Sequence, residues 1–495
     1  MIKSAFPISL LLFFLLIQNI IPQSARAQSE VDATRYSTQG QGITARALAM
    51  GGAYTAVADD YSAVFFNPAG LAQMRRLEFN AGFNFLNAGS DATYLGKTVT
   101  ADNPVTALNS LGLVLPVPTY RGSLVFAFGY NRSQNFNTAQ NIDAFNSSGS
   151  INTYFQKFTP QFGSDGIILQ DYGSLAYNAF LLNEDGGTNP RYIDPRITGN
   201  VQQQSKLLED GGTNSFVLSG ALEAAPSLFL GATLNFINGR YSYARTYSEQ
   251  DVSNVYANFN SFTLKDDIES DVNGFNLKAG LLYRLDDAWR FGLTVETPTY
   301  FRLKDRYSSS LGVSFSTSDS STDASNNFYD GEFEYELTTP FVFSGGLSYE
   351  FLFLTLSGNV TFKDWTQQRY ITSELSDVNA LFKSDFQQTL DFAVGGELRV
   401  PATPVRLRAG YSIENSPYKF KLAAPSATPS VRTDLNDARK TLSLGAGLLF
   451  RKTFAIDVAY LYTTQILESR PYPTADVITE SVKATNVVVT ASFRF

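Results

Sequence analysis

Three basic residues, Lys278, Arg406 and Arg408, lie at positions whose side chains would face the inside of a closed β-sheet. Each falls in a short segment where apolar and polar residues alternate, so the apolar neighbours share one face and the basic residue lies on the other. An ammonium or guanidinium group on that inner face can bind a carboxylate. Paired charges that simply fill a wet interior are the simpler explanation, and a contact with the acidic end of a ligand is the alternative.

The chain contains no histidine and no cysteine. This excludes serine or cysteine hydrolysis that depends on histidine, as well as haem, disulfides and zinc sites built from His or Cys. We therefore expect no enzyme, no metal site and no cofactor. The 46 acidic side chains outnumber the 38 basic ones, which argues against a nucleic-acid partner.

A second candidate binding region is the apolar stretch at residues 166–182 (GIILQDYGSLAYNAFLL), inside the longest predicted connection, residues 133–214. It is too apolar for a simple solvated loop, and its spacing of four residues is typical of a short helix with one apolar face. Two interpretations stay open: a groove that captures a hydrophobic ligand, and a lid that only packs on the rim of the fold. The candidate ligand-binding residues are Ile167, Ile168, Leu169, Tyr172, Leu175, Tyr177, Phe180 and Leu181.

The elements that must position these residues are alternating segments with the period of a β-strand. Fourteen can be counted: 77–85, 109–115, 124–130, 215–223, 228–236, 275–283, 291–295, 341–349, 354–362, 390–398, 405–411, 442–450, 454–462 and 485–495. The connections are short at 116–122, 225–227, 285–289, 350–351, 401–403 and 451–452, and long between them. An even strand count with alternating short and long connections is typical of a closed barrel in the bacterial outer membrane. We predict an all-β, 14-stranded antiparallel transmembrane β-barrel over residues 76–495, with both termini in the periplasm.

Both ends of the chain support this location. Lys3, an apolar stretch at 8–21 and Ala25-Arg26-Ala27 are typical of a signal peptide, residues 1–27. Past Gln28, no stretch approaches the roughly 20 apolar residues that a spanning helix needs. The last residue, Phe495, resembles the terminal residue of outer-membrane barrels, which the barrel assembly machinery reads. That machinery is therefore an expected partner.

Residues 28–75 precede the first strand and do not alternate. Residues 45–73 (ARALAMGGAYTAVADDYSAVFFNPAGLAQ) are rich in small residues, and Asn67, Pro68 and Ala69 begin a tight turn before the first strand. Small residues with few charges can pack closely inside a confined space. We predict that residues 28–75 form a helical hatch, or plug, inside the lumen.

This stretch resembles the N-terminal hatch of the FadL family (OmpP1/FadL/TodX-like), outer-membrane transporters of long-chain fatty acids and other hydrophobic compounds. The family's Asn-Pro-Ala motif matches Asn67, Pro68 and Ala69. The resemblance implies passive uptake of a hydrophobic or amphipathic small molecule, a shift of the hatch, and lateral exit through a gap at a kink in the third strand. Gly129 of that strand lacks a side chain and is a candidate for permitting the kink.

The resemblance also implies that the protein spans the bacterial outer membrane and contacts its lipid and lipopolysaccharide. A second group of 14-stranded barrels has similar N-terminal sequences and acts as accessory shuttle proteins in type IX-like protein secretion. That role is the alternative to uptake. A general porin is disfavoured, since a plug obstructs the lumen.

Overall fold

The computed structural model describes residues 29–158, 171–184, 192–193, 195–315, 327–419, 438–451 and 453–495. The predicted signal peptide lies outside these residues. The helices, in chain order, are α2 (Glu30–Ser37), α3 (Ala45–Ala49), α4 (Ala63–Phe66), η1 (Pro68–Gln73), α5 (Asn152–Phe155), α6 (Tyr172–Asn178), η3 (Trp365–Gln367), η4 (Ser373–Leu375) and α7 (Val378–Ser384), where η marks a 3₁₀-helix.

The strands are β1 (Glu78–Tyr94), β2 (Lys97–Val117), β3 (Leu124–Asn135), β4 (Thr138–Asn146), β5 (Asn183–Glu184), β6 (Tyr192–Ile193), β7 (Val201–Ala225), β8 (Leu228–Gln250), β9 (Phe259–Arg284), β10 (Trp289–Glu296), β11 (Tyr300–Phe315), β12 (Asn327–Thr338), β13 (Val342–Phe351), β14 (Leu354–Asp364), β15 (Arg369–Tyr370), β16 (Gln388–Arg399), β17 (Val405–Glu414), β18 (Arg439–Phe450), β19 (Phe454–Ser469) and β20 (Ile478–Arg494).

These strands form a closed antiparallel barrel of 14 strands, as predicted. Three of the 14 are broken into two consecutive pieces: β3 with β4, β10 with β11, and β12 with β13. The barrel closes because β20 pairs with β1, in a register that sets Phe493 opposite Phe79. Closure leaves no sheet edge in the hydrocarbon, where an unpaired N–H or C=O group would be costly. Every predicted segment falls within one of these strands to within one residue at either end.

Alternation decides which face each side chain takes. In β1, Phe79, Phe83 and Phe85 are exposed on the outer face, whereas Glu78 and Asn80 are buried on the lumen side. A lipid-facing apolar belt and a polar interior are what a membrane-embedded barrel requires. Within the described residues, no helix is long and apolar enough to cross a membrane.

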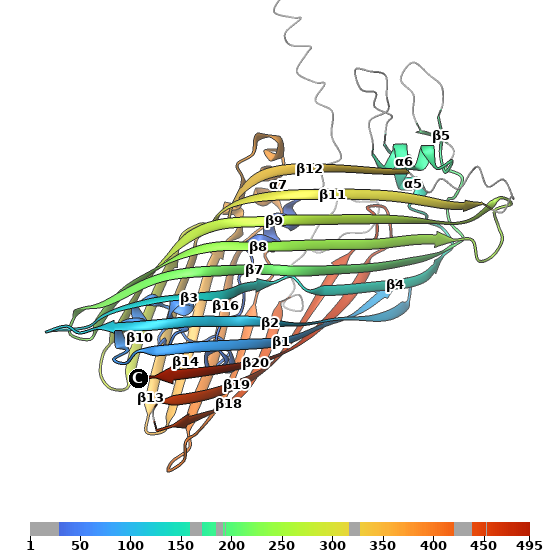
Figure 1. Ribbon diagram of the computed structural model, residues 1–495. Helices are drawn as coiled ribbons and strands as arrows, with labels where there is room; N and C mark the ends of the chain where they lie inside the picture. The colour runs from blue at the N-terminus through green and yellow to red at the C-terminus, as the bar shows by residue number, and fades with distance from the viewer. Residues whose placement is uncertain are drawn as a thin grey trace, which may run out of the picture.

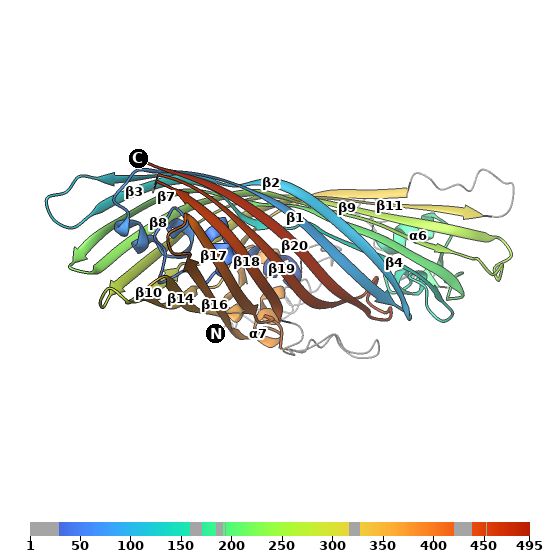
Figure 2. The same cartoon turned by 90° about the horizontal axis from the view of Figure 1, so that it is seen from below.

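The barrel has two ends of different construction. Figure 1 shows the hatch, in blue, inside the barrel near the end where the chain terminates, and Figure 2 shows the same segment beneath the sheet. Strands β7, β8 and β9 run far beyond it, over 25, 23 and 26 residues, toward α5 and α6. A strand of 9–11 residues spans a bilayer, so these strands continue well outside it. Much of what the sequence presented as long loops is thus strand, including residues 138–146 and 201–214 of the predicted connection 133–214.

The outer end has its own apolar core. Helices α5 and α6 pack there against β8, β9, β11 and the β19–β20 connection, with Phe155, Leu175 and Tyr247 among the buried residues. Glu249 of β8 is fully buried and accepts hydrogen bonds from the Ile151 N–H (2.8 Å) and the Gln203 side chain (2.9 Å). Burial raises the pKa of the Glu249 carboxyl. The carboxyl therefore ties α5 to the sheet at the centre of this core.

At the inner end, the hatch fills the lumen and is seated on lumen-facing glycines. A Cβ atom at any of these glycines would lie within 3.0 Å of a hatch atom, so a side chain there would displace the hatch. At Gly410, for example, a Cβ would lie 2.2 Å from the Gly51 nitrogen. The glycines are Gly112, Gly129, Gly231, Gly280, Gly292, Gly346, Gly395, Gly410 and Gly445, one in each of nine strands.

Candidate functional site

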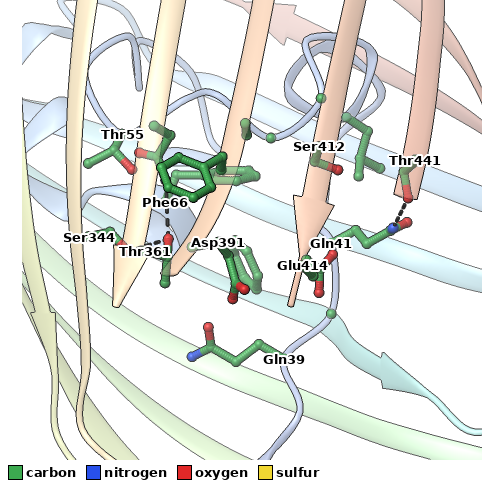
Figure 3. Close-up of a pocket in the computed structure, with 18 of the residues that line it drawn as sticks. Gln39, Gln41, Thr55, Phe66, Ser344, Thr361, Asp391, Ser412, Glu414 and Thr441 are labelled. Atoms are coloured by element: carbon green, nitrogen blue, oxygen red, sulfur yellow. Dashed lines mark hydrogen bonds between the residues drawn. The ribbon is translucent and has the colours of Figure 1, made fainter. Parts of the chain in front are cut away.

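Two small chambers lie in the lumen beside the hatch, on either side of the strip formed by residues 38–42. The hatch chamber, of about 120 Å³, is bordered by the hatch and by β14, β16, β17 and β18 (Figure 3). The second chamber, of about 80 Å³, is bordered by β3, β7, β8 and the breaks in the β10–β11 and β12–β13 strands. We call it the seam chamber, because its β3 residues adjoin the point where main-chain pairing between β2 and β3 ends. Both are lined by Gln39, Gly40, Phe65, Lys278 and Lys363. The strip therefore separates two spaces that share two lysines; Asp391 and Glu414 also line the hatch chamber, and Glu296 lines the other chamber.

The strip is fastened at both of its sides. On the hatch-chamber side, the Gln41 amide donates to the Thr441 hydroxyl of β18 (2.8 Å), as Figure 3 shows. On the other side, the Gly40 N–H donates to the Ser133 carbonyl of β3 (3.1 Å). The Gln134 amide of β3 reaches back to the Arg35 carbonyl of α2 (2.5 Å). Helix α2 and the strip thus hold a short stretch of β3 through main-chain groups.

That stretch of β3 is where the wall is irregular. The β3–β7 register shifts between Arg132 and Gln134, and Phe136 lies in the break before β4. Phe136 is buried, and its ring packs edge-on against Tyr36 of α2, with 5.8 Å between ring centroids. Gly129, the predicted kink residue, instead pairs in regular register with Gly112. Both glycines make room for the Tyr61 ring of the hatch.

Next to this irregularity, the wall has a seam without main-chain pairing. Strand β2 pairs with β3 only from Val117 to Ser110, and β4 pairs with β7 alone, so within the described residues 97–109 of β2 have no main-chain partner on that side. Side chains bridge the seam instead: the Asn103 amide donates to the Thr138 carbonyl (3.3 Å) and the Glu209 carbonyl (3.0 Å). A few side-chain hydrogen bonds separate more easily than a continuous ladder of main-chain hydrogen bonds.

The hatch is fastened directly at the inner end of the seam. The Tyr61 hydroxyl donates to the Asn131 side chain (2.9 Å), at the last β3 residue that pairs with β2. The Asn109 amide donates to the Ile43 carbonyl (2.8 Å), and Asn109 is the residue of β2 left out of the β1–β2 register. These two contacts close the inner end of the seam against the hatch.

Two lysines line both chambers but differ in their partners. The Lys278 ammonium donates to the Phe65 carbonyl (2.6 Å) and pairs with Glu296 (2.8 Å). Lys363 is only 6% exposed, and among the described residues its ammonium has neither a carboxylate within ion-pair distance nor a hydrogen-bond acceptor. Its nitrogen lies 5.3 Å from the centroid of the Trp365 ring. A buried, unpaired cation is costly unless an anion joins it.

The other two predicted cations lie elsewhere. Arg406 and Arg408 line neither chamber and form an ion-pair cluster with Glu397 beneath the hatch, at 3.1 Å and 2.7 Å. Arg408 also pairs with Asp457 (2.7 Å), and Arg46 of the hatch pairs with Glu397 (2.9 Å). These charges fasten the hatch to the wall. The simpler explanation, paired charges that fill the lumen, describes their contacts.

The residues of the predicted apolar stretch that the structure describes belong to the outer core. Leu175 and Leu181 are buried there, Tyr172 and Tyr177 pack against it, and Phe180 is half exposed. None of these five residues lines either chamber. The other three, Ile167, Ile168 and Leu169, lie outside the described residues. The contacts of the five described residues, with the outer core, are those of the lid interpretation.

The Asn-Pro-Ala turn anchors the hatch to the wall. The Asn67 amide donates to the Thr55 carbonyl (2.8 Å) and to the Leu281 carbonyl of β9 (3.0 Å), and its oxygen accepts from the Ala69 N–H (3.1 Å). Asn67 fits against Gly280, where a Cβ would lie 2.1 Å from its side-chain oxygen. The motif therefore joins two parts of the hatch to one strand.

Sequence reasoning missed Lys363 and the strip. Lys363 follows Phe362 by one position, so the alternation that placed Phe362 outward also places Lys363 in the lumen. Nothing in the sequence, however, shows that it lacks an anionic partner. The strip has no regular secondary structure, so no periodic pattern in the sequence identifies it. Only its hydrogen bond to Ser133 of β3 in the folded barrel does so.

Comparison with known proteins agrees with this architecture. Residues 197–493 match the family described as outer membrane protein transport protein (OMPP1/FadL/TodX), and no curated protein matches the sequence. The crystal structure of a Pseudomonas aeruginosa FadL homologue is similar, with a TM-score of 0.55 and 13% identity over 93% of this chain and 100% of that one.

Two toluene transporters show the same fold. TodX of P. putida has a TM-score of 0.52 and 15% identity, and the match covers 92% of this chain and 99% of that one. TbuX of Ralstonia pickettii has a TM-score of 0.52 and 16% identity, with the same coverage. The family match extends over more than half of the 495 residues, so the chain belongs to the OMPP1/FadL/TodX family of transport proteins of the bacterial outer membrane.

Proposed function

We propose that the protein is a passive channel that takes up hydrophobic or amphipathic small molecules and releases them sideways into the membrane. The observation that carries this proposal is the pair of chambers separated by the strip, one of which borders the irregular stretch of β3. Membership of a family of transport barrels, and the similarity to the toluene transporters TodX and TbuX, support the same class of cargo.

In this proposal the ligand passes from the hatch chamber to the seam chamber when the strip moves, and leaves through the seam between β2 and β3–β4. The strip is the element suited to move, because few hydrogen bonds fasten it. The rest of the hatch, residues 45–73 (the hatch body), is held by close contacts at nine glycines and by the Arg46–Glu397 ion pair. The rearrangement is therefore confined to α2 and the strip, while residues 45–73 stay in place.

The ligand class we favour is an amphiphile with one carboxylate, such as a long-chain fatty acid. Lys363 supplies a buried cation that has no ion-pair partner among the described residues, and Lys278, already paired with Glu296, supplies a second positive group beside it. Phe65, Phe66 and Leu48 offer an apolar wall for the chain. An aromatic hydrocarbon would need no cation, which makes the two classes separable by experiment.

The first test is uptake of labelled oleate and of toluene by a host that lacks its own hydrophobic-compound transporter, with and without this protein. We expect saturable uptake of oleate. Lys363→Met should lower oleate uptake at limiting concentration roughly tenfold or more, since a hydrogen bond to a charged group contributes about 1.5–3 kcal/mol. Toluene uptake should not change with this substitution.

Leu175→Ala is the matched control, because Leu175 lies in the outer core and lines neither chamber. At equal amounts of folded barrel it should leave oleate affinity unchanged. An equal loss of oleate uptake in Lys363→Met and Leu175→Ala would contradict a role of Lys363 in oleate binding. No uptake of either compound by a correctly folded barrel would instead favour the accessory role in protein secretion.

The second test addresses the strip. A Cβ at Gly40 would lie 2.1 Å from the Ser133 carbonyl oxygen, so Gly40→Ala should push the strip away from β3 and raise the rate of uptake. Gly312→Ala, where no atom lies within 4 Å, is the control. Unchanged uptake in Gly40→Ala would contradict gating by the strip. We also propose that the barrel contacts outer-membrane lipid and lipopolysaccharide and that the barrel assembly machinery reads Phe495; neither proposal depends on uptake.

A further inference from the structure

An open groove of about 810 Å³ crosses the outer face of β3, β7, β8, β9, β11 and β12, which lie side by side in Figure 1. Gly211, Gly212 and Gly239, which carry no side chains, lie along its floor. It is lined by four cationic side chains and two carboxylates, namely Arg132, Arg240, Arg302 and Lys304 with Asp271 and Glu334. The groove opens away from the lumen and shares no residue with the two chambers.

The strand register places this groove at a defined level. Five aromatic residues lie directly opposite one another on neighbouring strands and form one outward row: Tyr130, Phe216, Phe236, Phe275 and Tyr300. Aromatic side chains gather at the boundary between the hydrocarbon and the headgroups. The groove begins two residues beyond this row, toward the outer end, and therefore lies at the level of the outer-leaflet headgroups.

The first row of the groove has the side chains that bind phosphorylated sugars. In register across the five strands stand Arg132, Asn214, Asn238, Asn273 and Arg302. Amide groups donate to and accept from sugar hydroxyls, and guanidinium groups bind phosphate in a bidentate manner. The row thus presents hydroxyl-binding groups flanked by phosphate-binding groups over three neighbouring strands.

The cationic character is concentrated at the β3–β8 end. Arg132 donates to the Gly211 carbonyl (2.7 Å), but its buried Nε has no acceptor and no carboxylate pairs with it among the described residues. Arg240 reaches Asp271 only at 3.5 Å, and Arg306 holds the same carboxylate at 2.8 Å. At the opposite end, Arg302 and Lys304 pair with glutamates of β12. An anion is therefore expected to bind most favourably beside Arg132 and Arg240, whose charges are the least neutralised by carboxylates.

We propose that this groove binds the phosphorylated sugar headgroup of an outer-leaflet glycolipid, with Arg132 and Arg240 on a phosphate and the three asparagines on the sugar. The acyl chains then lie against the aromatic row below. The site is independent of the uptake proposal, because none of its residues lines the chambers. It also places a bound lipid beside the register shift of β3.

The test is native mass spectrometry of the purified full-length barrel in detergent, titrated with bis-phosphorylated hexa-acyl lipid A and, separately, with its dephosphorylated form. We expect a bound bis-phosphorylated molecule that resists the release of detergent, and at least tenfold weaker retention in the double variant Arg132→Gln, Arg240→Gln. Arg75→Gln is the control, since Arg75 is an exposed arginine near the periplasmic turn and carries the same charge. Heat-modifiable migration checks that each barrel is folded.

Three outcomes would overturn the proposal. One is undiminished lipid A retention in the double variant. Another is equal retention of the dephosphorylated form, which would mean that the acyl chains alone bind. The third is displacement of lipid A by millimolar inorganic phosphate, which would show a site for free phosphate. Each readout is a binding measurement, so failure here leaves the uptake proposal untouched.

Discussion

The two ends of the barrel fill their interiors by different means. At the inner end, the hatch meets main-chain atoms of the wall at nine glycines and is fastened by buried ion pairs. At the outer end, extended strands enclose α5 and α6 around an apolar core like that of a soluble domain. The inner packing leaves small chambers beside charged residues. At the outer end, none of the five described residues of the predicted groove lines either chamber.

This difference indicates where amino-acid substitutions are tolerated. Contacts between main chains permit no adjustment of side chains, and a buried cation depends on its carboxylates. Contacts between apolar side chains yield gradually as volume is lost. We therefore propose that residues 45–73 of the hatch stay fixed and that the weakly bound strip between the two ends is the gate.

The largest expected effect comes from breaking the buried ion pairs of the inner end. Arg408, whose side chain is 1% exposed, neutralises both Glu397 and Asp457. Arg408→Met should lower the free energy of unfolding by about 3–5 kcal/mol, because it leaves two carboxylates without this partner in a buried site. Urea titration of the barrel in lipid vesicles measures the change.

The control for Arg408→Met is Arg75→Met. The Arg75 side chain is 61% exposed and lies 3.5 Å from Glu223. Because solvent screens such a pair, its loss should change the free energy of unfolding by no more than about 1 kcal/mol. If both variants unfold at the same urea concentration, the buried ion pairs of the inner end stabilise the barrel no more than the exposed Arg75–Glu223 pair does.

A smaller effect is expected from the seat of the hatch. Gly410→Ala places a Cβ 2.2 Å from the Gly51 nitrogen and should lower the free energy of unfolding by about 1–3 kcal/mol, as overpacking does. It should also expose the hatch to protease from the periplasmic side. Gly358→Ala, where the nearest atom is 4.0 Å away, is the matched control in a neighbouring region of the wall. An equally protected hatch in both variants would contradict the close fit.

The smallest expected effect tests the outer end through pH. The folded state raises the pKa of Glu249, so it binds the proton more tightly than the unfolded state does. The resulting stability is fully present below the ordinary pKa of a glutamate and is lost as the pH rises through the raised value. Protease cleavage within the outer core should therefore accelerate from pH 4 to pH 8. Glu249→Gln should flatten this profile, and an unchanged profile would assign the pH dependence to other groups.

Much of the barrel could be predicted from the sequence, and the reason is local. Alternation with a period of two, an aromatic outer face and short turns at every second connection follow from each strand's own residues, so all 14 strands were found. The strand extensions beyond the membrane were not, because polar residues on both faces hide the period. Residues 201–214 of β7 are an example.

The candidate site was predicted only in part. Lys278 lies on both chambers as a lumen-facing cation, but Arg406 and Arg408 have the same pattern and lie in the cluster beneath the hatch. The sequence shows which face a side chain takes and not how deep it lies or which anion it meets. Likewise, the missing side chain of Gly129 suggested a kink there, but Gly129 pairs in regular register and accommodates Tyr61, while the wall is broken at Phe136.

The membrane barrel, its strand count and a small-residue hatch could all be predicted from the sequence, since these depend on periodicity and composition along the chain. Three features follow from the folded barrel alone: among the described residues, Lys363 has no ion-pair partner and residues 97–109 of β2 pair on one side only, and the strip of residues 38–42 meets Ser133. The physical reason is that pairing, both of charges and of main chains, joins residues far apart in the chain. Closure of the barrel brings them together, and no local pattern records the result.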